Sequence, residues 1–270
     1  MSRYRRFPAV LTMPLVVCLL GPAPRAAAQS HGDLMARGIA ASEALDPRAA
    51  AASFNAILAR DTLSAEANWR AALALVDIAK QTPASAKSPV RDSLYLVAQG
   101  YARRAIRLAP GSADARFALT MALGLWVETL RLMQQVRHVG EIYTDAVRAV
   151  ELDPTHDGAL HVLGRWHADV MRASGFERFM ARKFLGAAVM GQASWAEAAR
   201  LLEGAVSSRP DFIYHRIDLA KAYVDMKRYA DARAQLEVIA TLPTRDVLDP
   251  LYRAEAVDLL TRISGKSEER

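Results

Sequence analysis

Recurrent proline-centred breaks divide this chain into segments of helical length. Four of the breaks read alike, at Arg107-Leu-Ala-Pro110, Glu151-Leu-Asp-Pro154, Ser208-Arg-Pro210 and Ala240-Thr-Leu-Pro243. Because proline cannot continue a helix but starts the following turn well, each break is expected to end one helix and precede another. Between the breaks apolar residues recur at helical spacing and nothing alternates like a strand, which predicts an all-α chain.

Ahead of several breaks, small or apolar residues lie four and three positions apart, which places them on one helix face. The trios are Ala50, Phe54 and Ile57, then Ala98, Ala102 and Ala105, then Ala198, Leu202 and Ala205. One helix pair cannot bury such a stripe alone, whereas stacked pairs bury a continuous core. The step of 33 residues from Pro210 to Pro243 resembles the 34-residue tetratricopeptide repeat.

Two other steps are longer, 44 residues from Pro110 to Pro154 and 56 from Pro154 to Pro210, which indicates longer helices or inserted turns. We therefore predict a tetratricopeptide-like α-α superhelix of about five helix pairs over residues 31–265, with an inserted segment at 171–192. Residues 248–263 are expected to form a terminal capping helix.

The first 28 residues have the layout of a secretory signal peptide. A positive start at Arg3, Arg5 and Arg6 is followed by an apolar block, residues 9–20, and by the small residues 26–28. The block is too short, and too interrupted by Pro14, to span a membrane stably. We expect cleavage near Ala28, a periplasmic or secreted protein, and no transmembrane segment afterwards. A mitochondrial presequence is the alternative interpretation.

Cleavage also changes the chemistry that the chain can offer. Cys18 is the only cysteine and lies within the leader, so the mature chain can form neither a disulfide nor a thiolate metal site. Four of the 35 basic residues precede the cut and no acidic residue does, which leaves 31 basic and 29 acidic residues and a net charge of +2. This balance predicts no nucleic-acid partner.

In repeats of this kind, the first helix of each pair lines the concave side. The residues expected to point inward are Trp69, Leu73, Asp77, Phe117, Met121, Leu125, His161, Arg165, Asp169, Lys221 and Asp225. An apolar floor in the middle with a polar wall from His161, Arg165 and Lys221 suits an extended peptide, or an acyl chain with an anionic head. The same spacing also fits Phe117 and Met121 as core residues, with the charges on an ordinary solvated face.

No motif for catalysis, for a cofactor or for a metal stands out. The chain has no Gly-x-Ser-x-Gly, no P-loop and no dinucleotide fingerprint, so we expect no catalytic residues and no cofactor. His156, His161 and His167 lie five and six positions apart, whereas ligand pairs on a helix need three or four. We therefore expect no metal site.

The segment 171–192 does not fit a repeat helix. It contains Phe176 and Phe179 beside the basic residues Arg178, Arg182 and Lys183. Such an amphipathic element suits a membrane surface or a lid over the groove. A short connecting helix that fills the gap between the two helices of one repeat is the interpretation that the architecture favours.

Several motifs in this region, taken in order, resemble the regulator of microtubule dynamics family. They are His161-Val-Leu-Gly-Arg-Trp166, Phe176-Glu-Arg178, Phe184-Leu-Gly186, Ser194-Trp-Ala-Glu-Ala198 and Asp218-Leu-Ala-Lys-Ala-Tyr223. The resemblance covers roughly residues 34–263. It implies an all-helical tetratricopeptide-like domain without enzymatic activity, and it places Arg165 and Trp166 at family positions.

The animal members of that family are described as microtubule-associated, and the repeat domain of one binds and transfers phospholipid. This exported, Ala- and Arg-rich chain is typical of a bacterial member. Because a periplasm has no microtubules, microtubule binding is not carried over. We expect a non-enzymatic scaffold that holds a peptide or protein partner in its groove; a lipid-binding or lipid-transfer protein is the alternative, and a hydrolase with an unrecognised site a third. If Arg165 contacts the ligand, Arg165→Ala should weaken binding more than it lowers the melting temperature.

Overall fold

A computed structural model describes residues 30–82, 88–184 and 187–266. Its helices, in chain order, are α1 (His31–Glu43), α2 (Pro47–Leu58), α3 (Ala65–Lys80), α4 (Pro89–Leu108), α5 (Ala113–Val127), α6 (Leu132–Gln135), η1 (Val136–His138), α7 (Val139–Leu152), α8 (Asp157–Arg172), α9 (Gly175–Phe184), η2 (Ala188–Gln192), α10 (Trp195–Ser208), α11 (Ile213–Asp225), α12 (Tyr229–Ile239) and α13 (Asp249–Ile263). The predicted leader, residues 1–28, lies outside the described residues, as do Leu185, Gly186 and the last four residues of the tail.

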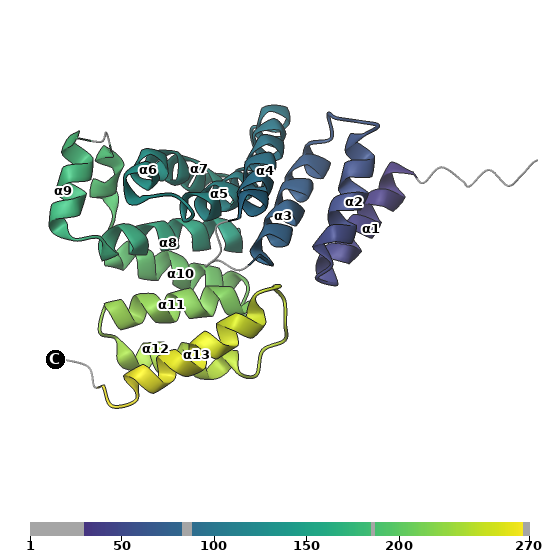
Figure 1. The fold of residues 1–270 in the computed structure, drawn as a ribbon. Coiled ribbons are helices and arrows are strands. Elements are labelled where there is room, and N and C mark those ends of the chain that lie inside the picture. Colours follow the sequence, from purple (N-terminus) through teal and green to yellow (C-terminus); the bar gives the residue numbers. More distant parts are fainter. Residues whose placement is uncertain (1–29, 83–87, 185–186, 267–270) are drawn as a thin grey trace, which may run out of the picture. The chain divides into compact units, whose positions relative to one another are not determined.

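The helices form consecutive antiparallel pairs, as Figure 1 shows. The pairs are α1 with α2, α3 with α4, α5 with α7, α8 with α10, and α11 with α12, and α13 packs on the last pair. Each pair contacts the next one along the chain, and no strand occurs in the residues that the structure describes. The predicted all-α tetratricopeptide-like fold of about five pairs is confirmed, and α13 lies where the capping helix was expected.

Local sequence explains where the helices begin. Ser64, Ser88, Ser112 and Ser194 each precede a helix, and each hydroxyl accepts a hydrogen bond from the backbone N–H three residues later. Asp46 caps α2 in the same way, ahead of Pro47 in the first turn. The breaks centred on Pro110, Pro154 and Pro210 fall in the turns before α5, α8 and α11.

The trios of small and apolar residues lie on buried helix faces. All nine side chains are almost completely excluded from solvent: Ala50, Phe54, Ile57, Ala98, Ala102, Ala105, Ala198, Leu202 and Ala205. Glycines permit two further close approaches. A Cβ on Gly158 would meet the ring of Phe117, and a Cβ on Gly164 would meet Leu202. Small residues therefore set how closely α8 packs against α5 and α10.

The insertion lies between the two helices of the fourth pair. Helix α8 continues to Arg172, so Met171 and Arg172 complete a repeat helix and the insertion is shorter than the predicted 171–192. Ala181 of α9, Met190 of η2 and Ala187 just before η2 form one buried cluster with Trp166. This is the connecting helix that the architecture favoured. A second insertion, α6 with η1, separates α5 from α7 and accounts for the long step to Pro154.

One ion-pair cluster joins helices that are not neighbours in the stack. Lys80 at the end of α3 contacts Asp77 at 3.1 Å and Asp246, in the loop before α13, at 2.9 Å. The Lys80 and Asp246 side chains are buried, although 166 residues separate them in the chain. Burial lowers the pKa of Lys80, but the two carboxylates outweigh it and hold that pKa well above its usual value. We call Asp77, Lys80 and Asp246 the clasp.

No helix in the described ranges has the length and apolar character needed to cross a bilayer.

Candidate functional site

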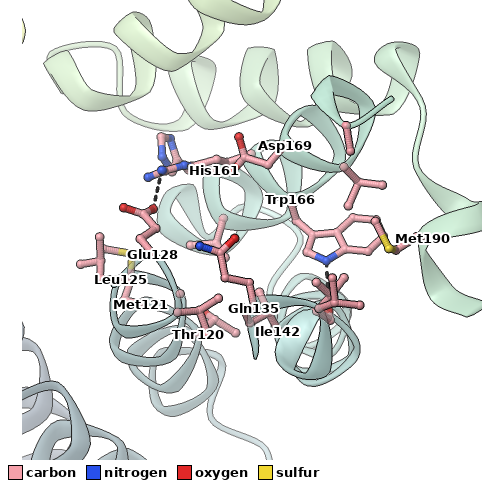
Figure 2. A pocket seen from close by; sticks show the side chains of 18 of the residues that line it. Thr120, Met121, Leu125, Glu128, Gln135, Ile142, His161, Trp166, Asp169 and Met190 are labelled. Atoms are coloured by element: carbon pink, nitrogen blue, oxygen red, sulfur yellow. Dashed lines mark hydrogen bonds and ion pairs between the residues drawn. The ribbon is translucent and has the colours of Figure 1, made fainter. Parts of the chain in front are cut away.

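Two adjoining cavities lie between the first helices of successive pairs. Cavity A, of about 230 Å³, lies among α5, α6, η1, α7 and α8, and Figure 2 shows Trp166 and Met190 on one side with Glu128 and Leu125 on the other. Cavity B, of about 200 Å³, lies among α3, α5, α8 and the start of α11. Met121, His161 and Tyr214 line both, so these side chains form the wall between the two cavities.

Most of the residues expected to point inward line these cavities. Met121, Leu125, His161, Arg165 and Asp169 line cavity A. Leu73, Asp77 and Phe117 line cavity B together with Met121 and His161.

Trp69, Lys221 and Asp225 line neither cavity. The Trp69 ring is half-buried, and the guanidinium of Arg70 lies over one of its faces, with the Arg70 Cζ atom 4.3 Å from the ring centroid. Lys221 pairs with Asp218 at 3.2 Å and with Glu255 at 2.9 Å. The structure therefore brings together the middle of the predicted groove and leaves out its two ends.

Arg165 does not offer a free positive charge to cavity A. Its guanidinium donates hydrogen bonds to Glu128 of α5 and Tyr214 of α11, and it lies 3.4 Å from Asp169 and 3.9 Å from Asp218. Three carboxylates and a phenol thus surround one cation. The polar wall expected to attract an anionic head is in fact a network that ties α8 to α5 and α11.

A chain of polar groups, all buried except the half-buried Asp157, runs from α8 to α11 through the wall between the cavities. Asp157 Oδ2 lies 2.9 Å from His215 Nε2, and the Nδ1 atoms of His215 and His161 are 3.0 Å apart. His161 Nε2 lies 3.3 Å from Asp218 Oδ2. If His215 donates through Nε2 to Asp157, its Nδ1 accepts and His161 donates through its own Nδ1.

The environment fixes the charge states along much of this chain. Burial lowers the pKa of His215 to about 4, against the opposing effect of Asp157, so this ring is neutral at pH 7. Burial alone would raise the pKa of Asp157, but the hydrogen bond with His215 and nearby cations lower it to about 2. Asp218 is buried too, yet His161, Arg165 and Lys221 hold its pKa below the usual value. Both carboxylates are therefore ionised.

Trp166 anchors α8 to its surroundings. The indole Nε1 donates to the carbonyl of Val139 at 3.1 Å, and the ring lies 4.4 Å from that of Tyr143, between centroids. One edge of the ring also lines cavity A, beside Met190 of the insertion (Figure 2). Trp166 therefore shapes the cavity while it holds α7, α8 and η2 together.

The basic and aromatic residues of the insertion divide into two groups. Arg178 folds back and donates to the carbonyls of Met171, at 3.0 Å, and of Ala173, and so caps the end of α8. Phe176 and Phe179 are 71% and 52% exposed, and Arg182 and Lys183 are also exposed. None of these five side chains lines either cavity, so the structure contains no lid made from them. The side chain of Phe184 is outside the described residues.

Among the lining residues that were not singled out from the sequence are Glu128, Met190, Tyr214 and His215. Met190 belongs to the insertion, which has no repeat register from which to count, whereas Glu128 ends α5 three residues after Leu125, so the inward count along this helix stopped one step short of it. Tyr214 and His215 lie in the first turn of α11, where aromatic and histidine side chains directly after a Pro210 break were a signal that inward counting overlooked.

The described residues contain no group of three or more His, Asp or Glu side chains placed to hold a metal ion. His156, His161 and His167 do point in different directions: His156 caps α8, His161 faces His215, and His167 accepts from the backbone of Ser194.

Comparison with known proteins adds a family and a fold. The model of the family described as "Regulator of microtubule dynamics protein 1-3" matches residues 42–264. Regulator of microtubule dynamics protein 1 of Caenorhabditis elegans is 24% identical over 172 residues, which cover 64% of this chain and 75% of that protein.

Among solved structures, the chain is similar to TTC0263, a thermophilic TPR protein of Thermus thermophilus. The two share 15% identity with a TM-score of 0.60 over 84% of this chain and 99% of the other. At this identity the likeness concerns the fold alone.

Proposed function

This chain belongs to the regulator of microtubule dynamics family, and on that premise we propose that it is a non-enzymatic helical-repeat scaffold exported to the cell envelope. It holds an extended segment of a protein partner between the first helices of its pairs. Tetratricopeptide-like scaffolds bury the helix faces between neighbouring repeats and leave an extended concave surface for partners, which is why the family supports this role.

The observation that carries the proposal is the pair of cavities A and B, which share one wall. Each is smaller than the roughly 300–1,000 Å³ of sites that enclose a whole small-molecule ligand. Each has instead about the size of one large side chain, and an extended peptide directs alternate side chains to the same face. Two anchor side chains of one segment could therefore occupy A and B together.

Glycine substitutions test this proposal with little disturbance of the fold. Gly124 lines cavity A, and a Cβ built on it meets no atom within 4 Å. Gly124→Leu should therefore fill cavity A without a backbone clash. Gly100→Leu is the matched control, because Gly100 also lies within a helix, has equally open surroundings and lines neither cavity.

We expect peptides selected from a random display library on the mature protein to lose at least tenfold in affinity with Gly124→Leu. Gly100→Leu should leave their affinity within twofold of wild type. If Gly124→Leu binds the selected peptides as tightly as wild type does, cavity A is not their site and the proposal fails.

Export rests on the leader, and the mature terminus tests it. Intact-mass measurement of the protein isolated from its native envelope fraction should give a chain that begins at or near Gln29. A full-length protein recovered from the cytoplasm would contradict export and leave the binding proposal to be tested separately.

Lipid binding or transfer is the second candidate, and the apolar lining of cavity A favours it. Met121, Leu125, Val136, Ile142, Trp166 and Met190 all face this space. About 230 Å³ cannot enclose two long acyl chains, so a lipid would insert at most one short apolar segment. Native mass spectrometry of gently purified protein distinguishes the lipid role from the peptide role. A co-purifying phospholipid that is lost in Gly124→Leu would favour the lipid role. A ligand-free mass would favour the peptide role.

A further inference from the structure

The solvent-accessible edge of cavity A carries negative charge beside apolar surface. Glu128 at the end of α5 and Asp169 near the end of α8 line this cavity, and their side chains are 53% and 50% exposed. Leu132 of α6, also in the lining, is 60% exposed. We call Glu128, Leu132 and Asp169 the rim.

The only cation that lines cavity A in the described chain cannot balance this rim. Arg165 is less exposed than either rim carboxylate, and its contacts with Tyr214, Glu128, Asp169 and Asp218 engage all its nitrogen atoms. Arg172 pairs with Asp169 at 2.6 Å and also with Asp225 at 2.8 Å, so it is shared between two carboxylates. The rim carboxylates are therefore more exposed than the two arginines that pair with them, and carboxylate oxygens accept hydrogen bonds and attract cations.

Below the rim the cavity is apolar and has the volume of one large side chain. An occupant that matches both regions has an apolar group for the interior and a positive charge close to it. An acidic peptide, or the phosphate of a lipid, would bring a negative charge to Glu128 and Asp169, and like charges at an interface cost binding energy.

We propose that cavity A recognises a basic peptide motif, in which a large apolar side chain enters the cavity and a Lys or Arg next to it or two positions away pairs with Glu128 and Asp169. This inference rests on the proposed peptide-binding function and specifies the class of partner. An extended chain advances about 3.3 Å per residue, so long basic side chains at these positions reach the rim from an anchor in the cavity.

Three matched pools of nine-residue peptides test the motif. All pools carry Leu, Met, Phe or Trp at the centre, and they differ only in flanking residues, which are Lys and Arg in the first pool, Glu and Asp in the second, and Ser and Gln in the third. Fluorescence anisotropy at 50 mM and 300 mM salt measures binding to the mature protein. We expect the basic pool to bind at least tenfold more tightly than the acidic pool at low salt, and this preference to shrink at high salt.

Substitutions at the rim then show whether the preference for basic peptides depends on the charge of Glu128 and Asp169 or on the shape of the cavity. Glu128→Gln and Asp169→Asn keep the size of each side chain and should each reduce the preference for the basic pool by about threefold to fivefold, as expected for half-exposed ion pairs. Glu66→Gln is the charge-matched control, because this carboxylate pairs with Arg70 on α3, away from the rim, and should leave the preference unchanged. Gly124→Leu should abolish binding of every pool.

The possible failures are distinguishable. Acidic or neutral peptides that bind as well as basic ones, and still lose binding with Gly124→Leu, would overturn the basic motif and leave the peptide-binding function standing. A basic preference that Glu128→Gln and Asp169→Asn do not reduce would also overturn it. No binding by any pool at millimolar concentration would reject both the motif and the proposed function.

Discussion

At the scale of single residues, two positions show how much depends on the absence of a side chain or of a charge. Gly164 lies against Leu202, where even a Cβ would be 2.8 Å from the Leu202 Cγ and 3.1 Å from its backbone nitrogen. His215 is almost fully buried and faces both an ionised carboxylate and a second histidine. The packing around position 164 leaves room for glycine alone, and the packing around His215 favours the neutral imidazole ring.

Gly164→Ala should lower the free energy of unfolding by about 1–3 kcal/mol, because the added methyl group pushes α8 away from α10. Gly100→Ala is the control: nothing lies within 4 Å of its Cβ position, so the same change in α4 should raise stability by about 0.5–1 kcal/mol through helix propensity. Urea unfolding of both variants measures the difference, and equal effects would show that the α8–α10 contact is not tight.

His215 should make the protein less stable as the pH falls from about 6.5 to about 4. Its pKa is about 4 in the fold and near 6.5 when unfolded, so in this window the unfolded chain binds more protons and acid favours unfolding. The loss should be on the order of 2–3 kcal/mol near pH 4.

His215→Gln isolates this contribution. Gln cannot titrate, so the variant should lose less stability than wild type between about pH 6.5 and about pH 4.5, whatever its stability at neutral pH. Thermal melts across this range test the slope, and parallel profiles for the two proteins would show that His215 does not titrate as inferred.

At the scale of elements, the insertion depends on the end of the helix before it. Helix α8 ends at Arg172 without a glycine, and the guanidinium of Arg178 satisfies its last carbonyl groups instead. Because Arg178 itself belongs to α9, the cap of α8 and the position of α9 depend on the same side chain.

Arg178→Ala should therefore release α9 while the repeat helices stay intact. We expect amide hydrogen exchange to rise at least tenfold over residues 173–184, with little change over α10. Arg262→Ala, which removes an exposed arginine from α13, is the control for loss of positive charge. Unchanged exchange in α9 would mean that packing around Trp166 alone holds the insertion.

At the scale of the whole molecule, the clasp departs from the usual behaviour of repeat proteins. In a linear array each repeat contacts only its neighbours, and its stability is a sum of local terms. Here Lys80 joins the second helix pair to the loop before α13, so the C-terminal helices gain support from a distant part of the chain.

Lys80→Met should cost about 3 kcal/mol, because it leaves the buried Asp246 carboxylate without its partner. Adding Asp246→Asn should recover part of the loss, a coupling that a double-mutant cycle in urea would measure. Hydrogen exchange over residues 240–263 should rise in the single variant. Arg148→Met, which removes an exposed pair with Glu151, should cost less than about 1 kcal/mol; an equal cost for Lys80→Met would show that the clasp adds no stability.

The sequence alone determined the helix pairs, because they depend on local signals. Proline breaks, serine caps and the trios of small residues act within one or two turns, so the all-α fold and the buried faces of Ala98 and Leu202 could be predicted. Helical periodicity also located Met121, His161 and Arg165 on an inward face. The family resemblance drawn from motifs around Leu163–Trp166 is confirmed by the match over residues 42–264.

The roles of these residues follow from tertiary contacts, because charges act through neighbours that are distant in the sequence. From the sequence, Arg165 was expected to form part of an anion-binding wall. In the structure its guanidinium donates to Glu128 and Tyr214, which lie 37 and 49 residues away in the chain. Arg178 was a candidate for a membrane contact or a lid, whereas its guanidinium donates to carbonyl groups at the end of α8. Periodicity can place a side chain on a face, but the partner that neutralises it belongs to another helix, so the acidic rim of cavity A could not be found from the sequence.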